Sequence, residues 1–385
     1  MTTAPPIGNR YEVLETLGEG AMGLVWRVRD SVANQEVALK IISQRYGASS
    51  PGEAPSAKSV LQFQQEFRLM TQLRHPNCCA VYEYGLVADG SPFFTMEVVE
   101  GRGLDQLKPV DGPTFVHVLS QVLLALGYIH QLGFVHCDLK SANVRVKPDG
   151  TVKLMDYGLM EYARRPSGFI NGTIAYISPE VIRRGAIDQR TDLYSLGVLA
   201  YEMLTGRVPF DSTDARVVLA AHINEAPVPP TQLVQDIDPL HEHIVLKLLA
   251  KSPLDRYQSA YEALEALGVA VPAGIGGNLL TSPLMGRERE LEVLTASLAQ
   301  LKRGQGGQAL LLSGPSGIGK SRLLEEFRFT VQLANTLNVV GQSFEQGNSP
   351  YGPFVAVLKA LMPAVKQHIP DDLALYAPVL AQLLP

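Results

Sequence analysis

His136-Cys137-Asp138-Leu139-Lys140-Ser141-Ala142-Asn143 is the stretch that decides the fold of this 385-residue chain. It holds a carboxylate, an amine and a carboxamide at short spacing, with apolar residues on both sides. This pattern predicts a tight loop between a helix and a short hairpin. Such groups suit phosphoryl transfer, because the carboxylate can orient a hydroxyl, the amine can meet phosphate charge and the amide can hold a metal. The same residue types are common in surface turns, so partner residues elsewhere must decide between the two interpretations.

Composition limits the class of protein. The chain is 46% hydrophobic and 18% charged, and its length predicts two globular domains or more. A net charge of -5 does not favour a nucleic-acid or anionic-membrane partner. Three cysteines without a CxxC or Cys/His cluster argue against a disulfide framework and against zinc. Because neither a signal-peptide pattern nor an apolar run of ~20 residues is present, we expect a soluble, cytoplasmic protein without a membrane segment.

The first strand-like region, residues 11–42, contains the glycine motif G-x-G-x-x-G-x-V. The residues of this pattern are Gly18, Gly20, Gly23 and Val25. Glycine lets the backbone approach a ligand and present N–H groups to phosphates. In dinucleotide-binding proteins the glycines open a helix, whereas here Val25-Trp26-Arg27-Val28 continues as a strand. The pattern therefore predicts a glycine-rich hairpin.

Val37-Ala38-Leu39-Lys40 places a lysine at a strand end, as in the V-A-I-K pattern whose lysine reaches the α- and β-phosphates. Residues 47–58, rich in Ala, Ser, Pro and Gly, predict a flexible insertion. The next predicted helix, Phe63–Met70, carries Glu66 as the candidate ion-pair partner of Lys40. A solvated helix glutamate is the alternative. The other elements expected before His136 are strands at Val81–Gly85 and Phe93–Val99 and an apolar helix at Thr114–Leu132.

Together these motifs make residues 11–268 resemble a eukaryotic-type Ser/Thr protein kinase domain of the bacterial kind. The family's later motifs follow in order as Asp156-Tyr157-Gly158, Ser178-Pro179-Glu180, Asp192–Gly197 and Arg256. The resemblance implies an α+β bilobal protein-kinase fold with a small β-rich lobe and a large helical lobe, preceded by a flexible N-terminus at 1–10. It also implies ATP and Mg²⁺ as cofactors, protein Ser/Thr hydroxyls as substrates and a signalling role.

The resemblance also implies individual roles. Asp138 would orient the substrate hydroxyl and accept its proton, and Lys140 would meet the transferred phosphate. Lys40 would hold the α- and β-phosphates and pair with Glu66. Asn143 and Asp156 would hold Mg²⁺. The residues implied to contact the nucleotide are Gly18, Glu19, Gly20, Gly23, Val25, Ala38, Lys40, Met96, Glu97 and Val99, with Leu154 in the adenine slot. For the apolar residues of this set, core packing is the alternative.

Several further residues carry expectations from the family pattern. Lys140 and Thr173 match features of Ser/Thr-specific members, in which the threonine bonds the catalytic aspartate. Glu180 is expected to pair with Arg256, and Asp192 to brace the backbone of the catalytic loop.

Two departures from the pattern bear on regulation. Cys137 replaces the arginine of H-R-D, which in the family meets a phosphate on the activation segment. We therefore hypothesise that activity does not depend strongly on phosphorylation of that segment. Tyr157 replaces the phenylalanine of D-F-G, and we expect the change to be conservative in shape.

A second nucleotide motif follows a Gly/Ala/Pro-rich linker at 269–283. Gly314 to Ser321 reads G-x-x-x-x-G-K-S, between a predicted buried strand at 308–312 and a predicted helix at 322–327. Backbone N–H groups at the helix N-terminus would cradle phosphates, Lys320 would reach the β- and γ-phosphates and Ser321 would bind Mg²⁺. The P-loop residues singled out are Gly314, Gly317, Gly319, Lys320 and Ser321.

Residues 284–385 resemble the start of a STAND or AAA-like P-loop ATPase, on the P-loop together with Gly286-Arg287-Glu288 and Tyr351-Gly352-Pro353-Phe354. An amphipathic helix is expected to open at Leu284–Leu291. We find no Walker B strand after Lys320, so we expect a partial α/β P-loop NTPase domain, truncated from a longer protein. Nucleotide binding by this half is expected, and hydrolysis within these residues is not.

Three functions remain open from the sequence. The leading interpretation is an ATP-dependent Ser/Thr protein kinase regulated by the C-terminal P-loop region. The alternative is a nucleotide-sensing scaffold in which a kinase-like domain of weak or no activity is coupled to a P-loop switch. In the third, the P-loop half carries the main activity.

Overall fold

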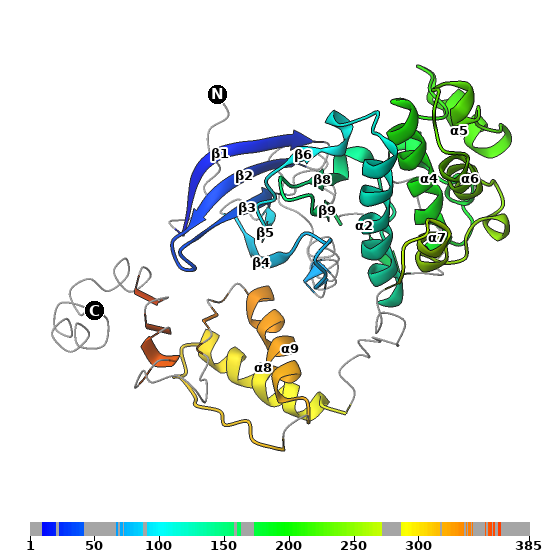
Figure 1. The fold of residues 1–385 in the computed structure, drawn as a ribbon. Helices are drawn as coiled ribbons and strands as arrows, with labels where there is room; N and C mark the ends of the chain where they lie inside the picture. Colours follow the sequence, from blue (N-terminus) through cyan, green and yellow to red (C-terminus); the bar gives the residue numbers. More distant parts are fainter. Residues whose placement is uncertain are drawn as a thin grey trace. The chain divides into compact units, whose positions relative to one another are not determined.

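A computed structural model describes residues 10–20, 23–41, 73–87, 91–157, 160–162, 173–271, 286–315 and 318–334, with scattered residues at 67–71 and 336–362. Strands dominate the first part, and helices dominate the part from residue 104 onward (Figure 1). This order matches the small β-rich lobe and large helical lobe expected from the sequence.

The first part is an antiparallel sheet in the order β1-β2-β3-β5-β4. Its strands are β1 (Tyr11–Gly20), β2 (Gly23–Asp30), β3 (Gln35–Ile41), β4 (Val81–Leu86) and β5 (Pro92–Met96). β1 and β2 meet where Gly20 pairs with Gly23. The glycine pattern therefore forms a hairpin and does not open a helix, as predicted.

The two faces of this sheet differ in what they carry. One face holds a buried cluster built from β1, β2, β3 and β5, which includes Trp26, Val28, Val37, Leu39 and Phe93. Alternate residues of β3 point the other way, because successive side chains of a strand lie on opposite faces. The second face of β3 therefore carries Ala38 and Lys40.

The helical part is built around α2 (Gly112–Gln131) and α4 (Gln189–Thr205), which pack against each other. Asp111 caps α2 by accepting from the Thr114 N–H at 2.9 Å, and Asp188 caps α4 with a reciprocal bond to Thr191. The other helices are α3 (Pro179–Ile182), α5 (Ala215–Asn224), α6 (Pro239–Leu248) and α7 (Ala260–Ala266). α7 packs on α2 and α6 packs on α4.

Two small sheets frame the loop that follows α2. β7 (Phe134–Val135) pairs with β10 (Glu161–Tyr162), while β6 (Arg102–Gly103), β8 (Val144–Val146) and β9 (Val152–Leu154) form the second sheet. The stretch from His136 to Asn143 thus runs between β7 and β8, and its last three residues form the 3-10 helix η2 (Ser141–Asn143). The predicted loop between a helix and a short hairpin is confirmed.

Within the described residues, α2 alone is long and apolar enough to cross a membrane by length and composition. Most of its apolar side chains are buried, and Phe115, Leu119, Val122 and Leu126 are fully so. α2 is accordingly a core helix of this structure.

Between residues 286 and 334 the C-terminal half contains two helices, α8 (Glu288–Lys302) and α9 (Lys320–Leu333), which pack together. Buried leucines line both, at Leu294 and Leu298 of α8 and at Leu323 of α9. α9 confirms the helix predicted after the P-loop, and α8 begins four residues later than Leu284.

The buried strand predicted at 308–312 is wrong for this structure. The run is irregular, and Leu311 is 95% exposed. A strand needs a neighbour that accepts and donates its backbone hydrogen bonds, and the described residues from 286 to 334 contain no other strand. Without a neighbouring strand, the apolar run at 308–312 has no partner for its backbone hydrogen bonds and no sheet in which its side chains could be buried.

Several expectations fall on positions outside the described residues. Among them are the N-terminus at 1–9, the insertion at 47–58, most of the helix at 63–70 with Glu66, and the linker from residue 272.

Candidate active site

The backbone of the catalytic loop is held by a buried carboxylate from α4. Asp192, which is fully buried, accepts the N–H of His136 at 2.7 Å and the N–H of Cys137 at 2.9 Å. The ring of His130 adds a third contact to the same carboxylate at 2.7 Å. Charge-assisted bonds of this kind are roughly twice as strong as neutral ones. The predicted bracing role of Asp192 is confirmed, whereas His130 was not anticipated.

This bracing supports an uncommon backbone conformation. Cys137 has φ = 65°, in the left-handed region that residues with a side chain rarely adopt. Such conformations persist where the surroundings over-determine them, and they cluster at functional sites. The turn at Cys137 directs the next residue, Asp138, into the centre of the site.

Asp138 is 4% exposed and each of its carboxylate oxygens is bonded. Oδ2 accepts from Lys140 Nζ at 2.7 Å and from Asn143 Nδ2 at 3.2 Å. Oδ1 accepts from both the backbone N–H and the hydroxyl of Thr173, each at 3.3 Å. The carboxylate, amine and amide expected to converge do so, and the Thr173–Asp138 contact is confirmed.

The amide of Asn143 is oriented by its neighbours. Its Nδ2 donates to the backbone carbonyl of Asp138 at 2.8 Å as well as to the carboxylate. Oδ1 therefore lies on the side turned away from Asp138. An amide oxygen and a carboxylate oxygen suit Mg²⁺, which usually takes one or two protein oxygens and completes its shell with water and phosphate.

Asp156 is the carboxylate that the sequence pairs with that amide as a candidate Mg²⁺ ligand. Its φ is 57°, again left-handed. The residue before it is fixed on both sides, because the Met155 N–H donates to the Asn143 carbonyl at 2.7 Å and the Met155 carbonyl lies 3.3 Å from His136 Nε2. Among the described residues no three or more His, Cys, Asp or Glu side chains form a cation site.

The sheet brings four of the expected nucleotide-contacting residues to one face. Val25 pairs with Lys40 across β2 and β3, and Ala38 pairs with Met96 across β3 and β5. Directly opposed residues point to the same side, and Ala38 and Lys40 alternate on one strand. The apolar side chains of this face surround a lysine that is 7% exposed.

The remaining residues that are expected to contact the nucleotide are described in part. A Cβ at Gly18 would have no heavy atom within 4 Å, so the hairpin is open on that side. Val99 is buried and its carbonyl accepts from Arg145 at 3.4 Å, and Glu97 is half-buried. The side chains of Glu19 and Glu66 and all of Gly158 lie outside the described residues, so the Lys40–Glu66 pair stays a prediction.

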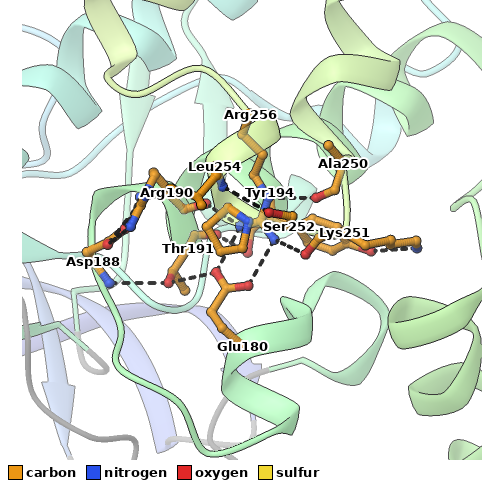
Figure 2. A network of polar contacts seen from close by, with 12 residues as sticks. Glu180, Asp188, Arg190, Thr191, Tyr194, Ala250, Lys251, Ser252, Leu254 and Arg256 are labelled. Atoms are coloured by element: carbon orange, nitrogen blue, oxygen red, sulfur yellow. Dashed lines mark hydrogen bonds and ion pairs between the residues drawn. The ribbon is translucent and has the colours of Figure 1, made fainter.

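A buried ion pair anchors the segment that carries Thr173. Figure 2 shows Arg256 facing Glu180, with Nη1 and Nη2 donating to its two carboxylate oxygens at 2.8 and 2.9 Å. The Thr191 hydroxyl donates to the same carboxylate at 3.0 Å. Arg256 also donates to three backbone carbonyls, those of Arg190, Ala250 and Lys251. The predicted pair is confirmed, and it fastens residues 173–180 to α4 and to the end of α6.

A buried polar chain was not anticipated from the sequence. The hydroxyls of Ser141 and Tyr176 lie 3.0 Å apart, Tyr176 donates to Glu202 at 2.5 Å, and Lys108 pairs with the same glutamate. Burial, together with the bond to Glu202, raises the pKa of Tyr176 and keeps its hydroxyl protonated. Buried tyrosine and serine hydroxyls require hydrogen-bond partners, so the residue types at these positions could have indicated a polar contact. Which residue serves as the partner depends on tertiary packing.

The P-loop residues are described except for Ser316 and Gly317. Gly319 has φ = 96°, which requires glycine, and α9 begins at Lys320 directly after it. Lys320 Nζ donates to the carbonyls of Gly314 and Pro315 at 2.7 and 2.8 Å. Ser321 is exposed at the N-terminus of α9. The amine and the helix N-terminus thus lie together in the loop, as a phosphate site requires.

Comparisons with known proteins match both halves. A family model described as protein kinase domain matches residues 11–266, and one described as AAA ATPase domain matches residues 283–385. Serine/threonine-protein kinase pkn3 of Myxococcus xanthus is 36% identical over 278 residues, covering 68% of this chain and 49% of that protein. Serine/threonine-protein kinase PknB of Mycolicibacterium smegmatis is 31% identical over 347 residues, covering 87% and 54% respectively. The chain spans about half the length of these curated relatives.

Proposed function

Because the chain belongs to the protein kinase family, we propose that it transfers the γ-phosphate of ATP to Ser and Thr hydroxyls of a protein substrate. The observation that carries this proposal is the carboxylate of Asp138, buried and bonded by Lys140, Asn143 and Thr173. The complete set argues against an inactive kinase-like domain, because each of these groups serves a different requirement of phosphoryl transfer.

In the proposed mechanism Asp138 orients the substrate hydroxyl and accepts its proton as the oxygen attacks phosphorus. Lys140 already contacts the Asp138 carboxylate at 2.7 Å, so its ammonium can meet the transferred phosphoryl group beside the base. Lys40, which pairs with Val25 across β2 and β3, would hold the α- and β-phosphates. These roles follow from residue types and positions that fit the chemistry of the family.

ATP and Mg²⁺ are the proposed cofactors. Mg²⁺ would be held by the Asn143 amide oxygen and the Asp156 carboxylate, and it would neutralise the charge of the phosphates. The protein's own contribution is to fix both ligands before the nucleotide arrives. It does so through the Asn143–Asp138 bonds and through the bonds on Met155.

The proposal is tested by incubating the full chain with radiolabelled ATP, Mg²⁺ and a mixture of Ser/Thr peptides. We expect phosphate incorporation that is lost in Asp138→Asn and in Lys40→Met and retained in Lys320→Ala. Equal labelling of the parent and Asp138→Asn, or none in any sample, would favour the alternative of a nucleotide-sensing scaffold.

Independence from activation-segment phosphorylation remains part of the proposal. Cys137 has no positive charge to receive a phosphate, and its N–H donates to Asp192 at 2.9 Å in the unphosphorylated chain. Thr173, the described end of that segment, is bonded to Asp138 and followed by the Glu180–Arg256 anchor. Phosphatase treatment should leave the rate within about twofold, and a loss that rephosphorylation restores would refute this.

A second candidate activity is nucleotide binding by the P-loop half, which would regulate the kinase half. The Lys320 contacts with Gly314 and Pro315 favour it, since a phosphate would replace those carbonyls as partners of the amine. We expect ADP to bind a Lys40→Met chain and to lose that binding when Lys320→Ala is added. A phosphoryl-transfer rate that Lys320→Ala leaves unchanged in an otherwise intact chain would count against regulation.

A further inference from the structure

The hydroxyl of Tyr157 marks the one difference between this chain's Asp-Tyr-Gly turn and the D-F-G pattern. Tyr157 is 3% exposed, and its hydroxyl donates to the carbonyl of Leu154 at 2.7 Å. The ring packs edge-on against His136, with centroids 5.7 Å apart. A phenylalanine could make the ring contact but could not make the hydrogen bond.

The acceptor of this bond belongs to a rigid part of the fold. Leu154 ends β9, and its carbonyl also accepts the N–H of Cys79 at 2.9 Å. Its own N–H donates to Asn77 at 2.8 Å, so Leu154 is tied to the segment beside β9 in both directions. The Tyr157 hydroxyl is thereby attached to a fixed point.

The hydroxyl of Tyr157 lies in a buried site, where the Leu154 carbonyl accepts its hydrogen bond and the Cys78 thiol is a second neighbour. A buried hydroxyl without an acceptor is unfavourable. Moving the Tyr157 ring out of its site would therefore break a bond as well as expose an aromatic surface.

Asp156 stands between two residues that are fixed independently. Met155 is bonded through its N–H to Asn143 and through its carbonyl to His136, and Tyr157 is bonded through its side chain to Leu154. The left-handed φ of 57° at Asp156 is unfavourable by itself. It persists because both neighbours hold it, as strained backbone generally does.

We propose that the Tyr157 hydroxyl is a positioning group for the metal site, which holds Asp156 in the conformation that receives Mg²⁺ with the nucleotide. The inference rests on the proposed function of Asp156. Without the bond, only a fraction of the molecules would have the turn ordered before Mg²⁺ binds. The apparent affinity for Mg²⁺ with the nucleotide would then be the intrinsic affinity multiplied by that fraction. The net effect of one hydrogen bond corresponds to a factor of about two to ten.

The test measures ADP affinity by calorimetry, with and without Mg²⁺, in the full chain carrying Lys320→Ala to silence the P-loop. Tyr157→Phe is compared with Tyr201→Phe in that background. Tyr201 is a matched control, because it is also buried and its hydroxyl donates to a single backbone carbonyl, that of Val228, at 2.9 Å. Both substitutions remove one oxygen atom and its hydrogen bond to a backbone carbonyl, and Tyr157→Phe also removes the contact with the Cys78 thiol. Thermal denaturation verifies that both variants are folded.

Without Mg²⁺, we expect Tyr157→Phe to bind ADP with the same affinity as the Lys320→Ala parent. The factor by which Mg²⁺ increases ADP affinity should be about two- to tenfold smaller in Tyr157→Phe than in that parent. Tyr201→Phe should keep the full gain. An unchanged Mg²⁺ effect in Tyr157→Phe, or an equal loss in both variants, would overturn the inference. A parent chain whose ADP affinity does not respond to Mg²⁺ would instead refute the proposed metal site, and the inference with it.

Discussion

Replacing Arg256 by methionine should destabilise the helical part strongly, because the guanidinium is fully buried and Glu180 is 11% exposed. Arg256→Met removes two bonds to the carboxylate of Glu180 and three to backbone carbonyls. It leaves a nearly buried carboxylate with the Thr191 hydroxyl as its remaining partner from this network. Removing one partner of a buried pair costs about 3–5 kcal/mol in free energy of unfolding. We expect a loss in that range.

Native-state hydrogen exchange of the α4 and α6 amides measures this loss locally, so unfolding of the C-terminal half does not interfere. The matched control is Arg216→Met. Arg216 forms the same two-point contact with Asp214 but is 89% exposed, and we expect no measurable change there. The double variant Arg256→Met/Glu180→Leu should recover part of the loss, because it removes the unpaired carboxylate but not the unpaired carbonyls. A loss below about 1 kcal/mol for Arg256→Met, the range of exposed pairs, would refute the reasoning.

Three further changes have defined outcomes. Thr173→Val removes a hydroxyl bonded to Asp138 at 3.3 Å, so the phosphoryl-transfer rate should fall about tenfold and Thr173→Ser should restore most of it in a peptide assay. Burial lowers the pKa of His222 to about 4 from 6.5, so the unfolded chain binds more protons between these values and stability is lost as pH falls through them. His222→Gln should flatten this dependence in urea titrations, whereas His243→Gln on the exposed side of α6 should not. Arg287→Ala removes a donor 3.1 Å from a P-loop carbonyl, and ADP affinity of a Lys40→Met chain should weaken about two- to tenfold by calorimetry.

The parts of the site that were predictable are those that the family's motifs identify or that lie close together in the sequence. Glu180 and Arg256 were paired because both match motif positions of the kinase family. The polar groups of His136–Asn143 are close along the chain, so their convergence follows from one short loop. The role of Asp192 was likewise expected from its motif position in the family pattern.

The remaining features depend on tertiary structure. The left-handed backbone at Cys137 and Asp156 has no residue signature here, because neither is glycine. That Leu154 accepts from Tyr157 depends on where β9 ends, so the change from phenylalanine was expected to matter only for shape. The strand predicted at 308–312 failed because apolar content does not reveal whether a partner strand is present.

The central claim is that Asp138 is the catalytic base of a protein kinase and not merely a buried structural carboxylate. The direct measurement is the single-turnover rate of phosphoryl transfer from ATP to a Ser/Thr peptide, with Mg²⁺–ADP affinity measured on the same preparations. For Asp138→Asn we predict a rate lower by about 10²–10⁴ and an ADP affinity within about threefold of the parent. A transfer rate that survives Asp138→Asn, with nucleotide affinity unchanged, would contradict the account.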